Sequence, residues 1–376
     1  MNFLFLPRYS RNGGSSRYRL LQYVPLFERA GHRVEVRPLF DAGYLDQLYK
    51  HGKRGLRRMA SGYARRVFSA MDVARFDAVI CEQEALPFAP AFVESWFQRK
   101  SLPYFLDFDD AAHIKYETNP LLRSKISSLI ARADGVVVGN AYLRNYASRF
   151  TERVTVIPTV VDLSRYPIGQ KSQANSDGVR VGWIGTPSTG IFLASLSNVF
   201  EALQGRFPSL KFRFIGATPE MNNPHLNIEF APWSEETEIE ALSGCDIGIM
   251  PVPDTSFTRG KCGLKLIQYM ACWLPAVASP VGANCEIVAD EETGFLAATD
   301  EQWFEKLSAL IAHPILRRQF GEAGRRRIER QYSLDEGFAR WMSVLGCAER
   351  SAPAKSHRSA APPATGCESM ARRSGR

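Results

Sequence analysis

The stretch RGKCGLKLIQYMACWLPAVASP, residues 259–280, decides the fold because it joins a glycine-broken turn to a helix and then to a strand. Its apolar residues recur at helical spacing, at Leu264, Ile267, Met270 and Ala271. The segment PAVAS that follows is typical of a short buried strand. A glycine turn that opens a helix presents unpaired backbone N–H groups and the positive end of the helix dipole, which together suit an anion. Because Lys261 and Lys265 flank this turn, we expect the anion to be a phosphate.

The same rhythm of a short apolar strand, a loop and a helical segment runs through both halves of the chain. In the first half the predicted strands lie in NFLFLP, RVEVRPLF, FDAVICEQ, PYFLDFDD, DGVVVGN and VTVIPTVVD. In the second half they lie in VRVGWIGT, LKFRFIGA, NIEFAPW, CDIGIMPV, PAVASP and TGFLAA. Strands that alternate with helices predict parallel sheets with helices on both faces.

The predicted fold class is therefore α/β, with two doubly wound, Rossmann-like domains that face each other across a cleft. We expect the first domain over residues 1–168 and the second over residues 178–330, with the polar segment 166–180 as the linker. A C-terminal helix over residues 331–348 is a candidate for crossing back to the first domain. Ligands of such sheets bind at the carboxyl ends of the strands, which predicts a ligand site in the cleft.

Composition excludes several classes of protein. No run of about 18 apolar residues is present, so no membrane-spanning helix is expected. Seven cysteines without a CxxC pair favour reduced thiols in a cytoplasmic protein, and no metal-ligand spacing occurs. The net charge of +8 is concentrated in part in the tail 351–376, which has five Lys or Arg against Glu368 and is expected to be disordered. The arginines of RRQFGEAGRRRIERQYS are interpreted as a solvated face, because no aromatic interleaving indicates nucleic-acid binding.

A second basic run, KHGKRGLRRMASGYARR from Lys50 to Arg66, contains no acidic residue. Apolar residues fall on one helical face around it, at Leu45, Leu48, Tyr49, Leu56, Met59 and Tyr63. The pattern predicts a basic amphipathic helix. Such a helix either lies on an anionic membrane surface or packs its apolar face on the sheet with its charges solvated.

Two glycine loops follow predicted strands. In RYSRNGGSSRYR, Gly13 and Gly14 allow a ligand to approach the backbone closely, although a plain strand-to-helix turn has the same composition. In VGWIGTPSTG, Gly185 is followed by the hydroxyl groups of Thr186 and Ser188. This loop lacks the Lys of a nucleoside-triphosphatase loop, and the dinucleotide fingerprint G-x-G-x-x-G is absent. What remains is a turn of the size that binds a phosphate.

The segment LDFDDAAH, residues 106–113, places polar residues after a predicted strand. Asp107 and Asp109 form a D-x-D, the metal-chelating pattern of one large class of sugar transferases, but carboxylates after a strand equally often cap helices or anchor loops. His113 is a candidate general base or orienting group, with a purely structural role as the alternative.

The stretch CGLKLIQYMACWLPAVASPVGANCEIVADEETGFLA resembles the C-terminal signature of GT-B glycosyltransferases of the family 4, or group 1, type. The resemblance extends to LFERAGHRVEV, DGVVVGN and VIPTVVD and covers most of residues 1–345. It implies a GT-B fold, a nucleotide-diphosphate sugar as donor, and a reaction that retains the anomeric configuration without a metal ion. The family's donor-binding positions correspond here to Gly14, Gly185, Gly260, Gly263, Leu264, Gln268 and Glu286.

The family pattern contains two glutamates separated by seven residues, written E-x7-E. In this chain Gly260 and Gln268 replace both glutamates. The Arg and Lys usual in the loop of the second domain are also missing from GTPSTG. Gln268 retains groups that can hydrogen-bond a ribose diol, since an amide both donates and accepts. Lys261 and Lys265 can supply the missing positive charge, with a surface role of Lys265 as the alternative.

The sequence therefore predicts a cytoplasmic, metal-independent, retaining glycosyltransferase without a cofactor. It would move a sugar from a nucleotide-diphosphate donor to a hydroxyl of a carbohydrate or lipid-linked acceptor, in cell-surface polysaccharide or glycolipid synthesis. The candidate catalytic residues are Asp109, His113 and Lys265. The candidate donor-binding residues are Gly13, Gly14, Gly185, Thr186, Ser188, Lys261, Gly263, Leu264, Lys265, Gln268 and Glu286. A sugar-nucleotide epimerase and a non-catalytic sugar-nucleotide binder remain the alternatives, and we expect no nucleic-acid partner.

Overall fold

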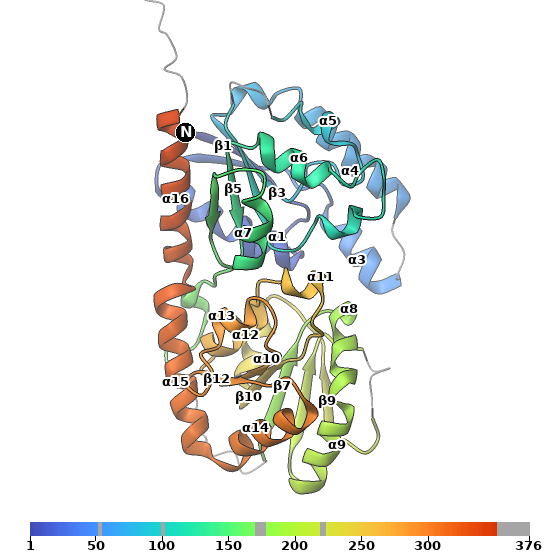
Figure 1. Cartoon of the computed structure of the whole chain (residues 1–376), viewed down its shortest axis with the longest axis vertical. Coiled ribbons are helices and arrows are strands. Elements are labelled where there is room, and N and C mark those ends of the chain that lie inside the picture. The colour runs from blue at the N-terminus through green and yellow to red at the C-terminus, as the bar shows by residue number, and fades with distance from the viewer. Residues whose placement is uncertain (52–54, 99–101, 170–177, 219–222, 352–376) are drawn as a thin grey trace, which may run out of the picture.

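The computed structural model describes residues 1–51, 55–98, 102–169, 178–218 and 223–351. It contains two six-stranded sheets, one above the other along the long axis of the molecule (Figure 1). Every strand pair in both sheets is parallel. All twelve strands predicted from the sequence are present, and the predicted fold class is confirmed. Of the predicted basic tail, Ser351 is the last residue of α16, and residues 352–376 lie outside the described residues.

The N-terminal sheet has the strand order β2-β1-β3-β4-β5-β6. Its strands are β1 (Asn2–Leu6), β2 (Arg33–Val36), β3 (Ala78–Glu82), β4 (Tyr104–Phe108), β5 (Gly135–Val138) and β6 (Val154–Val156). The central strands β3, β4 and β5 are buried along their whole length, as expected for parallel strands with helices on both faces. The helices of this domain are α1 (Gly14–Arg19), η1 (Leu21–Tyr23), α2 (Val24–Arg29), α3 (Ala42–His51), α4 (Leu56–Ser69), η2 (Val73–Arg75), α5 (Ala91–Glu94), η3 (Ile114–Tyr116), α6 (Lys125–Arg132), α7 (Ala141–Ala147) and η4 (Leu163–Arg165).

The C-terminal sheet has the strand order β12-β11-β10-β7-β8-β9. Its strands are β7 (Arg180–Ile184), β8 (Lys211–Ile215), β9 (Ile228–Ala231), β10 (Ile247–Met250), β11 (Ala276–Ala278) and β12 (Gly294–Leu296). The helices that follow β7 in the chain are α8 (Pro187–Gly190), η5 (Ile191–Leu196), α9 (Ser197–Arg206), α10 (Glu238–Ser243), α11 (Ser256–Arg259), α12 (Leu264–Ala271), α13 (Asn284–Ile287), α14 (Asp300–Ala312), α15 (Pro314–Gln331) and α16 (Leu334–Ser351). The helix and strand predicted from residues 259–280 are therefore α12 and β11.

The strand order reverses once in each sheet, between β1 and β3 and between β7 and β10. In open parallel sheets the loops at such a reversal diverge and leave a crevice at the carboxyl ends of the strands. Both crevices open toward the boundary between the two domains, where α1 and α11 lie (Figure 1). The topology thus directs the loops after β1, β3, β7 and β10 toward one shared region.

The last two helices connect the domains. α15 runs beside the C-terminal domain and α16 continues along the N-terminal domain (Figure 1). Trp341 and Leu345 of α16 belong to the buried cluster that contains Phe3, Phe5 and Phe27 of the N-terminal domain. Where α15 ends, Ser333 forms a parallel bridge with Val161, so the chain passes between the domains twice at neighbouring points. The C-terminal helix is thereby a structural part of the N-terminal domain.

The basic run from Lys50 to Arg66 does not form the single helix that the sequence predicted, because α3 ends at His51 and α4 begins at Leu56. The expected apolar face is also divided. Met59 and Tyr63 pack against the cluster of Leu39, Phe40, Tyr44 and Leu45, whereas Leu56 is 78% exposed. Gly62 lies against the carbonyl oxygen of Leu39, where a Cβ would collide. Residues 52–54 lie outside the described part of the chain.

None of the helices in the described part of the chain combines the length and apolar character needed to span a bilayer.

Candidate active site

A cavity of about 470 Å³ lies where the carboxyl ends of the two sheets meet. In the N-terminal domain its lining comes from the loop after β1, from α1 and from the loops after β4 and β6. In the C-terminal domain it comes from the loops after β7, β8, β9 and β10 and from the starts of α10 and α12. The lining residues are Asn12, Gly14, Ser15, Arg17, Tyr18, Arg19, Asp109, Asp110, Thr159, Ile184, Gly185, Thr186, Pro187, Thr189, Gly216, Trp233, Glu238, Met250, Lys261, Cys262, Gly263, Leu264, Lys265 and Gln268. Both domains therefore contribute to a single site.

The loop after β1 supplies the N-terminal wall of the cavity. Gly14 begins α1 and has open space around the position of a Cβ, so its backbone faces the cavity. Gly13 instead packs against the side chain of Tyr9 and is buried outside the lining. Ser15 donates a hydrogen bond to Asp109, whose other carboxylate oxygen accepts from Gln83 at 2.9 Å. The carboxylate of Asp109 is thus held at the edge of the cavity.

The D-x-D at residues 107–109 is split by the structure. Asp107 is fully buried and accepts from Nε and Nη2 of Arg19 at 2.9 and 2.5 Å. Arg19 is equally buried, and its Nη1 donates to the carbonyl oxygen of Ile157 at 2.8 Å. This bidentate pair occupies both oxygens of Asp107, so Asp107 and Asp109 do not face one common metal position. Among the described residues, no group of three or more His, Cys, Asp or Glu side chains could hold a metal ion.

Lys265 brings a cation to the loop after β7. Its Nζ donates to the carbonyl oxygen of Ile184 at 2.5 Å, lies 3.4 Å from Oγ1 of Thr189, and sits 4.3 Å from the ring centre of Trp183. A Cβ at Gly185 would collide with this ammonium group, so glycine is required there for close approach. Burial and the nearby charge of Lys261 lower the pKa of Lys265 to about 7. No carboxylate pairs with Lys265 among the described residues, so a bound anion would favour the protonated, charged form of its amine.

The turn before α12 is held by the N-terminal domain. The side-chain amide of Asn140 donates to the carbonyl oxygens of Gly260 and Lys261 at 3.1 and 2.9 Å. Gly260 lies so close to Ala111 that any side chain at position 260 would collide with it. Gly263 precedes α12 with a φ of 66°, the left-handed conformation that glycine adopts without strain. A glutamate at position 260 would therefore collide with the N-terminal domain in this arrangement of the two domains.

Lys261 points toward the N-terminal domain. Its Nζ lies 3.5 Å from Oδ1 of Asp110 and 4.5 Å from the ring centre of Phe257. Lys261 is thus paired with a carboxylate, whereas Lys265 has no carboxylate partner in the part of the chain that the structure describes.

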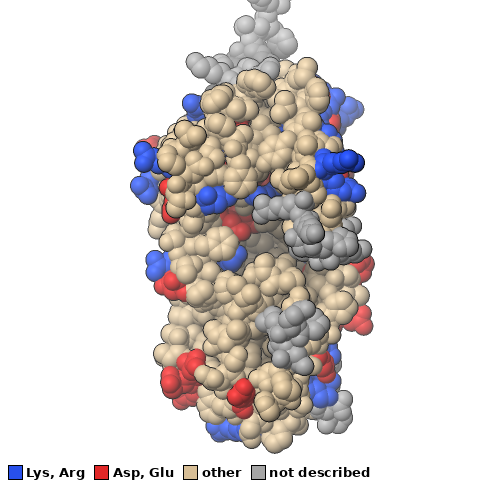
Figure 2. Space-filling model, turned by 90° about the vertical axis from the view of Figure 1, so that its right-hand side faces the viewer, with Lys and Arg blue, Asp and Glu red and all other residues tan. Residues whose placement is uncertain are grey.

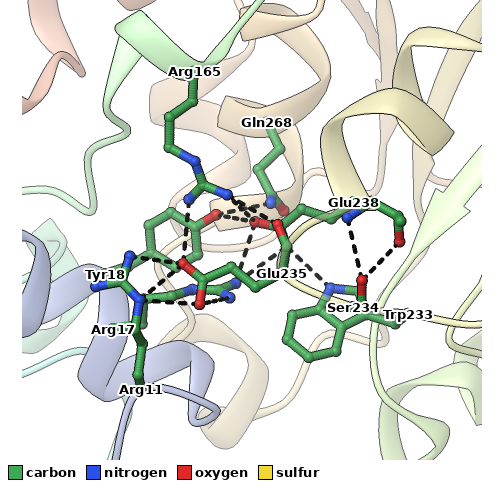
Figure 3. A network of polar contacts seen from close by, with 10 residues as sticks. Arg11, Arg17, Tyr18, Arg165, Trp233, Ser234, Glu235, Glu238 and Gln268 are labelled. Atoms are coloured by element: carbon green, nitrogen blue, oxygen red, sulfur yellow. Dashed lines mark hydrogen bonds and ion pairs between the residues drawn. The ribbon is translucent and has the colours of Figure 1, made fainter.

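A network of charged and polar side chains crosses the cleft beside Gln268 (Figure 3). Arg17 of α1 lies 3.1 Å from Glu238 and 3.4 Å from Glu235, and the hydroxyl of Tyr18 donates to Glu238 at 2.9 Å. Gln268 donates to the hydroxyl of Tyr18 at 3.1 Å. The outer members of the network are Arg11 and Arg165, which pair with Glu235, and Trp233, which donates to Glu238. The hydroxyl of Tyr18 thus connects the carboxylate of Glu238 to the side-chain amide of Gln268, the residue that stands where the family has its second glutamate.

The structure brings together most of the residues that the sequence predicted. Those that line the cavity are Gly14, Asp109, Gly185, Thr186, Lys261, Gly263, Leu264, Lys265 and Gln268. Gly13, Ser188, His113 and Glu286 do not line it. His113 stacks on Tyr146 with ring centres 3.7 Å apart, and a Glu286 oxygen accepts from the backbone N–H of Ala141 at 3.3 Å. The side chain of His113 is therefore engaged in packing, and that of Glu286 in a contact between the domains.

Sequence reasoning missed Arg17, Tyr18, Trp233 and Glu238. The signal for the first two was present in RYSRNGGSSRYR, because residues at the start of a helix after strand β1 face the crevice. Trp233 and Glu238 have no such local signal. They follow the edge strand β9 and reach the cavity only because the chain turns back across the ends of the neighbouring strands.

The arrangement is suited to an anion with a polar body. Backbone N–H groups at Gly14 and at the start of α12 face the same space as the ammonium group of Lys265. Beside them, Gln268, Tyr18 and Glu238 offer both donors and acceptors of hydrogen bonds. A nucleotide diphosphate combines these two needs, since its phosphates are anionic and its ribose carries a diol.

Comparison with known proteins gives a family for the C-terminal domain. Residues 181–313 match the family model described as glycosyl transferases group 1. The chain is 27% identical over 222 residues to a D-inositol 3-phosphate glycosyltransferase of Segniliparus rotundus, which is 52% of this chain and 48% of that protein. It is 37% identical over 79 residues to an alpha-maltose-1-phosphate synthase of Mycolicibacterium smegmatis, or 19% of this chain and 20% of that protein. The chain thus spans about half, or less, of the length of these curated relatives.

Solved structures match nearly the whole chain. Sucrose-phosphate synthase of Thermosynechococcus elongatus is 14% identical, with a TM-score of 0.67 over 93% of this chain and 100% of that one. The Anabaena protein HepE in complex with UDP and glucose is 16% identical, with a TM-score of 0.68 over 92% of this chain and 100% of that one. At these identities the structures show the fold. The chain is therefore a GT-B protein that resembles the group 1 glycosyl transferases, and its residues 181–313 match that family.

Proposed function

We propose that the protein is a retaining glycosyltransferase that moves a sugar from a nucleotide-diphosphate sugar to a hydroxyl group of an acceptor. The single observation that carries the proposal is the position of Lys265. Its ammonium group, without a carboxylate partner in the described residues, lies between the loop after β7 and the glycine turn before α12, in a cavity shared by both domains. The family resemblance supplies the donor type and the retention of configuration.

The donor's nucleotide would lie on the C-terminal wall, with its ribose near Gln268 and Glu238 and its diphosphate between Lys265 and the backbone of Gly14. Negative charge develops on the diphosphate as the bond to the sugar breaks. A fixed cation and preorganised N–H groups stabilise that charge more than they stabilise the bound donor, which lowers the barrier. Lys265 is the residue we assign to this role, and Asp109 would border the position of the sugar.

A uridine donor is the first to test, because HepE has been solved in complexes with UDP and with UDP-glucose. The experiment is calorimetric titration of the purified chain with UDP-glucose and with a panel of other sugar nucleotides, followed by product analysis with and without an acceptor. Binding, with transfer that keeps the anomeric configuration, supports the proposal. Conversion of the donor's sugar without any acceptor would reveal an epimerase, and binding without turnover would reveal a non-catalytic binder. No binding of any sugar nucleotide would overturn all three.

We further propose that the α4 side of the N-terminal domain contacts a membrane surface, which suits an acceptor used in cell-surface polysaccharide or glycolipid synthesis. Large apolar side chains are exposed there, with Phe68 67%, Met71 73%, Phe92 69% and Trp96 56% accessible. The face in Figure 2 shows wide uncharged surface in the upper domain with basic side chains at its margins. Apolar groups inserted at the interface and basic groups attracted to anionic lipid would act together.

A further inference from the structure

The hydroxyl of Tyr18 lies between two side chains of the C-terminal domain. The carboxylate of Glu238 is 2.9 Å away and the side-chain amide of Gln268 is 3.1 Å away (Figure 3). All three residues are buried. Tyr18 belongs to α1, whereas Glu238 begins α10 and Gln268 lies in α12. These two hydrogen bonds therefore join the N-terminal and C-terminal walls of the cavity between the domains.

The two hydrogen bonds have a fixed direction. Burial, with Glu238 nearby, raises the pKa of Tyr18 above its ordinary value, so the phenol keeps its proton. Glu238 also pairs with Arg17 at 3.1 Å, and an ionised carboxylate only accepts hydrogen bonds. Because the single proton of Tyr18 is donated to Glu238, the oxygen of Tyr18 can only accept from Gln268. The group of Gln268 that faces Tyr18 must then be the NH₂ group, Nε2.

The amide of Gln268 is thereby held in one of its two orientations. An amide carries its donor and its acceptor on separate branches, so Oε1 is directed away from the hydroxyl of Tyr18. Oε1 accepts no hydrogen bond from the described residues, and it is not one of the buried side-chain atoms that lack a partner. Oε1 therefore retains accessible surface. Because Gln268 lines the cavity between the domains, Oε1 is an acceptor open to a ligand there.

We propose that Tyr18 and Glu238 are positioning residues that turn the carbonyl oxygen of Gln268 toward a hydroxyl of the donor's ribose. A glutamine held in this way offers an acceptor without adding a second negative charge beside Glu238. The inference rests on the proposed function, because it concerns a nucleotide bound in the cavity between the domains.

The glutamate that is usual in the family at position 268 would not suit this network. In Gln268→Glu, two carboxylates would compete for the one proton of Tyr18 and would repel each other. Adding Glu238→Gln restores one carboxylate and one amide around the hydroxyl, with both hydrogen bonds reversed. The double variant also keeps the number of charges of wild type, so it should recover what the single variant loses.

The test is calorimetric titration of the protein with UDP, with the 2′-deoxy and 3′-deoxy forms of UDP, and with inorganic pyrophosphate. Wild type should bind UDP about tenfold more tightly than at least one deoxy form, because loss of the hydroxyl leaves Oε1 without a donor. Tyr18→Phe should reduce this preference to about one, since the amide is then free to turn. Its affinity for pyrophosphate, which has no ribose, should remain unchanged.

The exchange at position 268 gives a second measurement. Gln268→Glu should bind UDP about tenfold more weakly than wild type, because of the repulsion between the two carboxylates. The double variant Gln268→Glu with Glu238→Gln should regain most of the affinity and the preference for UDP over a deoxy form.

The matched control is Tyr332→Phe, which removes the hydroxyl of another buried tyrosine that does not line the cavity. This control should keep both the affinity for UDP and the preference over the deoxy forms. If Tyr18 only stabilised the fold, Tyr18→Phe would lower the affinities for UDP, the deoxy forms and pyrophosphate by the same factor, and the proposal would be wrong.

Failure of the proposed function and failure of this inference give different results. If wild type binds none of UDP, ADP and GDP, the proposed function fails. Binding of one of these nucleotides with equal affinity for its deoxy forms would overturn the orientation of Gln268 alone. An unchanged preference in Tyr18→Phe, or wild-type affinity in Gln268→Glu, would do the same. Tyr18→Phe keeps the test valid if a variant at Glu238 fails to fold, because it conserves the ring and leaves Glu238 paired with Arg17.

Discussion

In the proposed donor site, Lys265 would compensate, at a different position in the chain, for the cation missing from the loop after β7. It starts from α12, yet its Nζ reaches the carbonyl oxygen of Ile184 at the end of β7. Replacing Lys265 with Ala should weaken binding of the donor diphosphate about tenfold or more, because a hydrogen bond to a charged group is worth roughly 1.5–3 kcal/mol. Calorimetric titration of both proteins with the nucleoside diphosphate measures this. Lys261→Ala, which loses a lysine already paired with Asp110, should show an equal or smaller loss.

The lowered pKa of Lys265 makes stability depend on pH in a definite direction. In the unfolded chain this lysine has a pKa near 10.5, and in the folded protein about 7. Between these values the unfolded chain binds more protons, so the free energy of unfolding rises with pH from about 7 to 10.5. Chemical denaturation of wild type and Lys265→Met at pH 7 and pH 9.5 should show the difference growing in favour of wild type. Parallel pH profiles of wild type and Lys265→Met would contradict this. The affinity of wild type for a diphosphate should fall as the pH rises, because Lys265 loses its charge.

The pair of Arg19 and Asp107 bears on metal dependence. Because both oxygens of Asp107 accept from Arg19, chelation through the D-x-D would require breaking a buried ion pair. We therefore expect transferase activity to persist in EDTA. Activity measured before and after dialysis against the chelator tests this, and a complete loss restored by Mg²⁺ or Mn²⁺ would assign those carboxylates a chelating role.

At the scale of elements, one face of α4 packs on the N-terminal domain and the other is exposed and basic. Met59 and Tyr63 hold it to the domain, whereas Arg57 and Arg58 are exposed. Changing Arg57 and Arg58 together to Glu should reduce sedimentation with acidic lipid vesicles strongly, because each basic group near an anionic surface contributes about 1 kcal/mol. Arg54, a third basic residue of the run, lies outside the described residues.

The control for this element is donor affinity, which should remain unchanged in the double variant because α4 does not line the cavity between the domains. Vesicle binding should also fall at high salt, since surface electrostatics are screened. Equal sedimentation of the double variant and wild type would remove the basic face of α4 from membrane contact.

At the scale of the whole molecule, the network in Figure 3 links the two domains across the cleft. Arg17 and Glu238 are both buried, and breaking a buried ion pair by removing one partner costs about 3–5 kcal/mol. Removing Arg17 leaves Glu238 with the more distant Arg165, at 3.9 Å, as its cation, so the cost here lies at or below the lower end of that range. Arg17→Met should therefore favour an open arrangement of the domains. Small-angle X-ray scattering without ligand should report a larger radius of gyration. Arg11→Met is the matched control, because Arg11 is 60% exposed and its pair with Glu235 is worth little.

The sequence by itself determined the helices and strands and most of the C-terminal wall of the cavity between the domains. Runs of buried β-branched and aromatic residues specify parallel strands, and the spacing of Leu264, Ile267 and Met270 specifies α12, because both patterns express local periodicity. Gly185 and Lys265 could be predicted as parts of one site, since loops after parallel strands gather at one edge of a sheet. The identity of the family was carried by the same short motifs.

The tertiary structure alone decided which of those residues share a space. His113 and Glu286 carry suitable chemistry, yet stacking on Tyr146 and a backbone contact with Ala141 place both outside the cavity. Glu238 gains its position from contacts with residues far away in the sequence, Arg17 and Tyr18 among them. The division of the basic run into α3 and α4 has the same origin. Local periodicity reports which face of a segment is apolar, and only packing of the whole chain determines what that face meets.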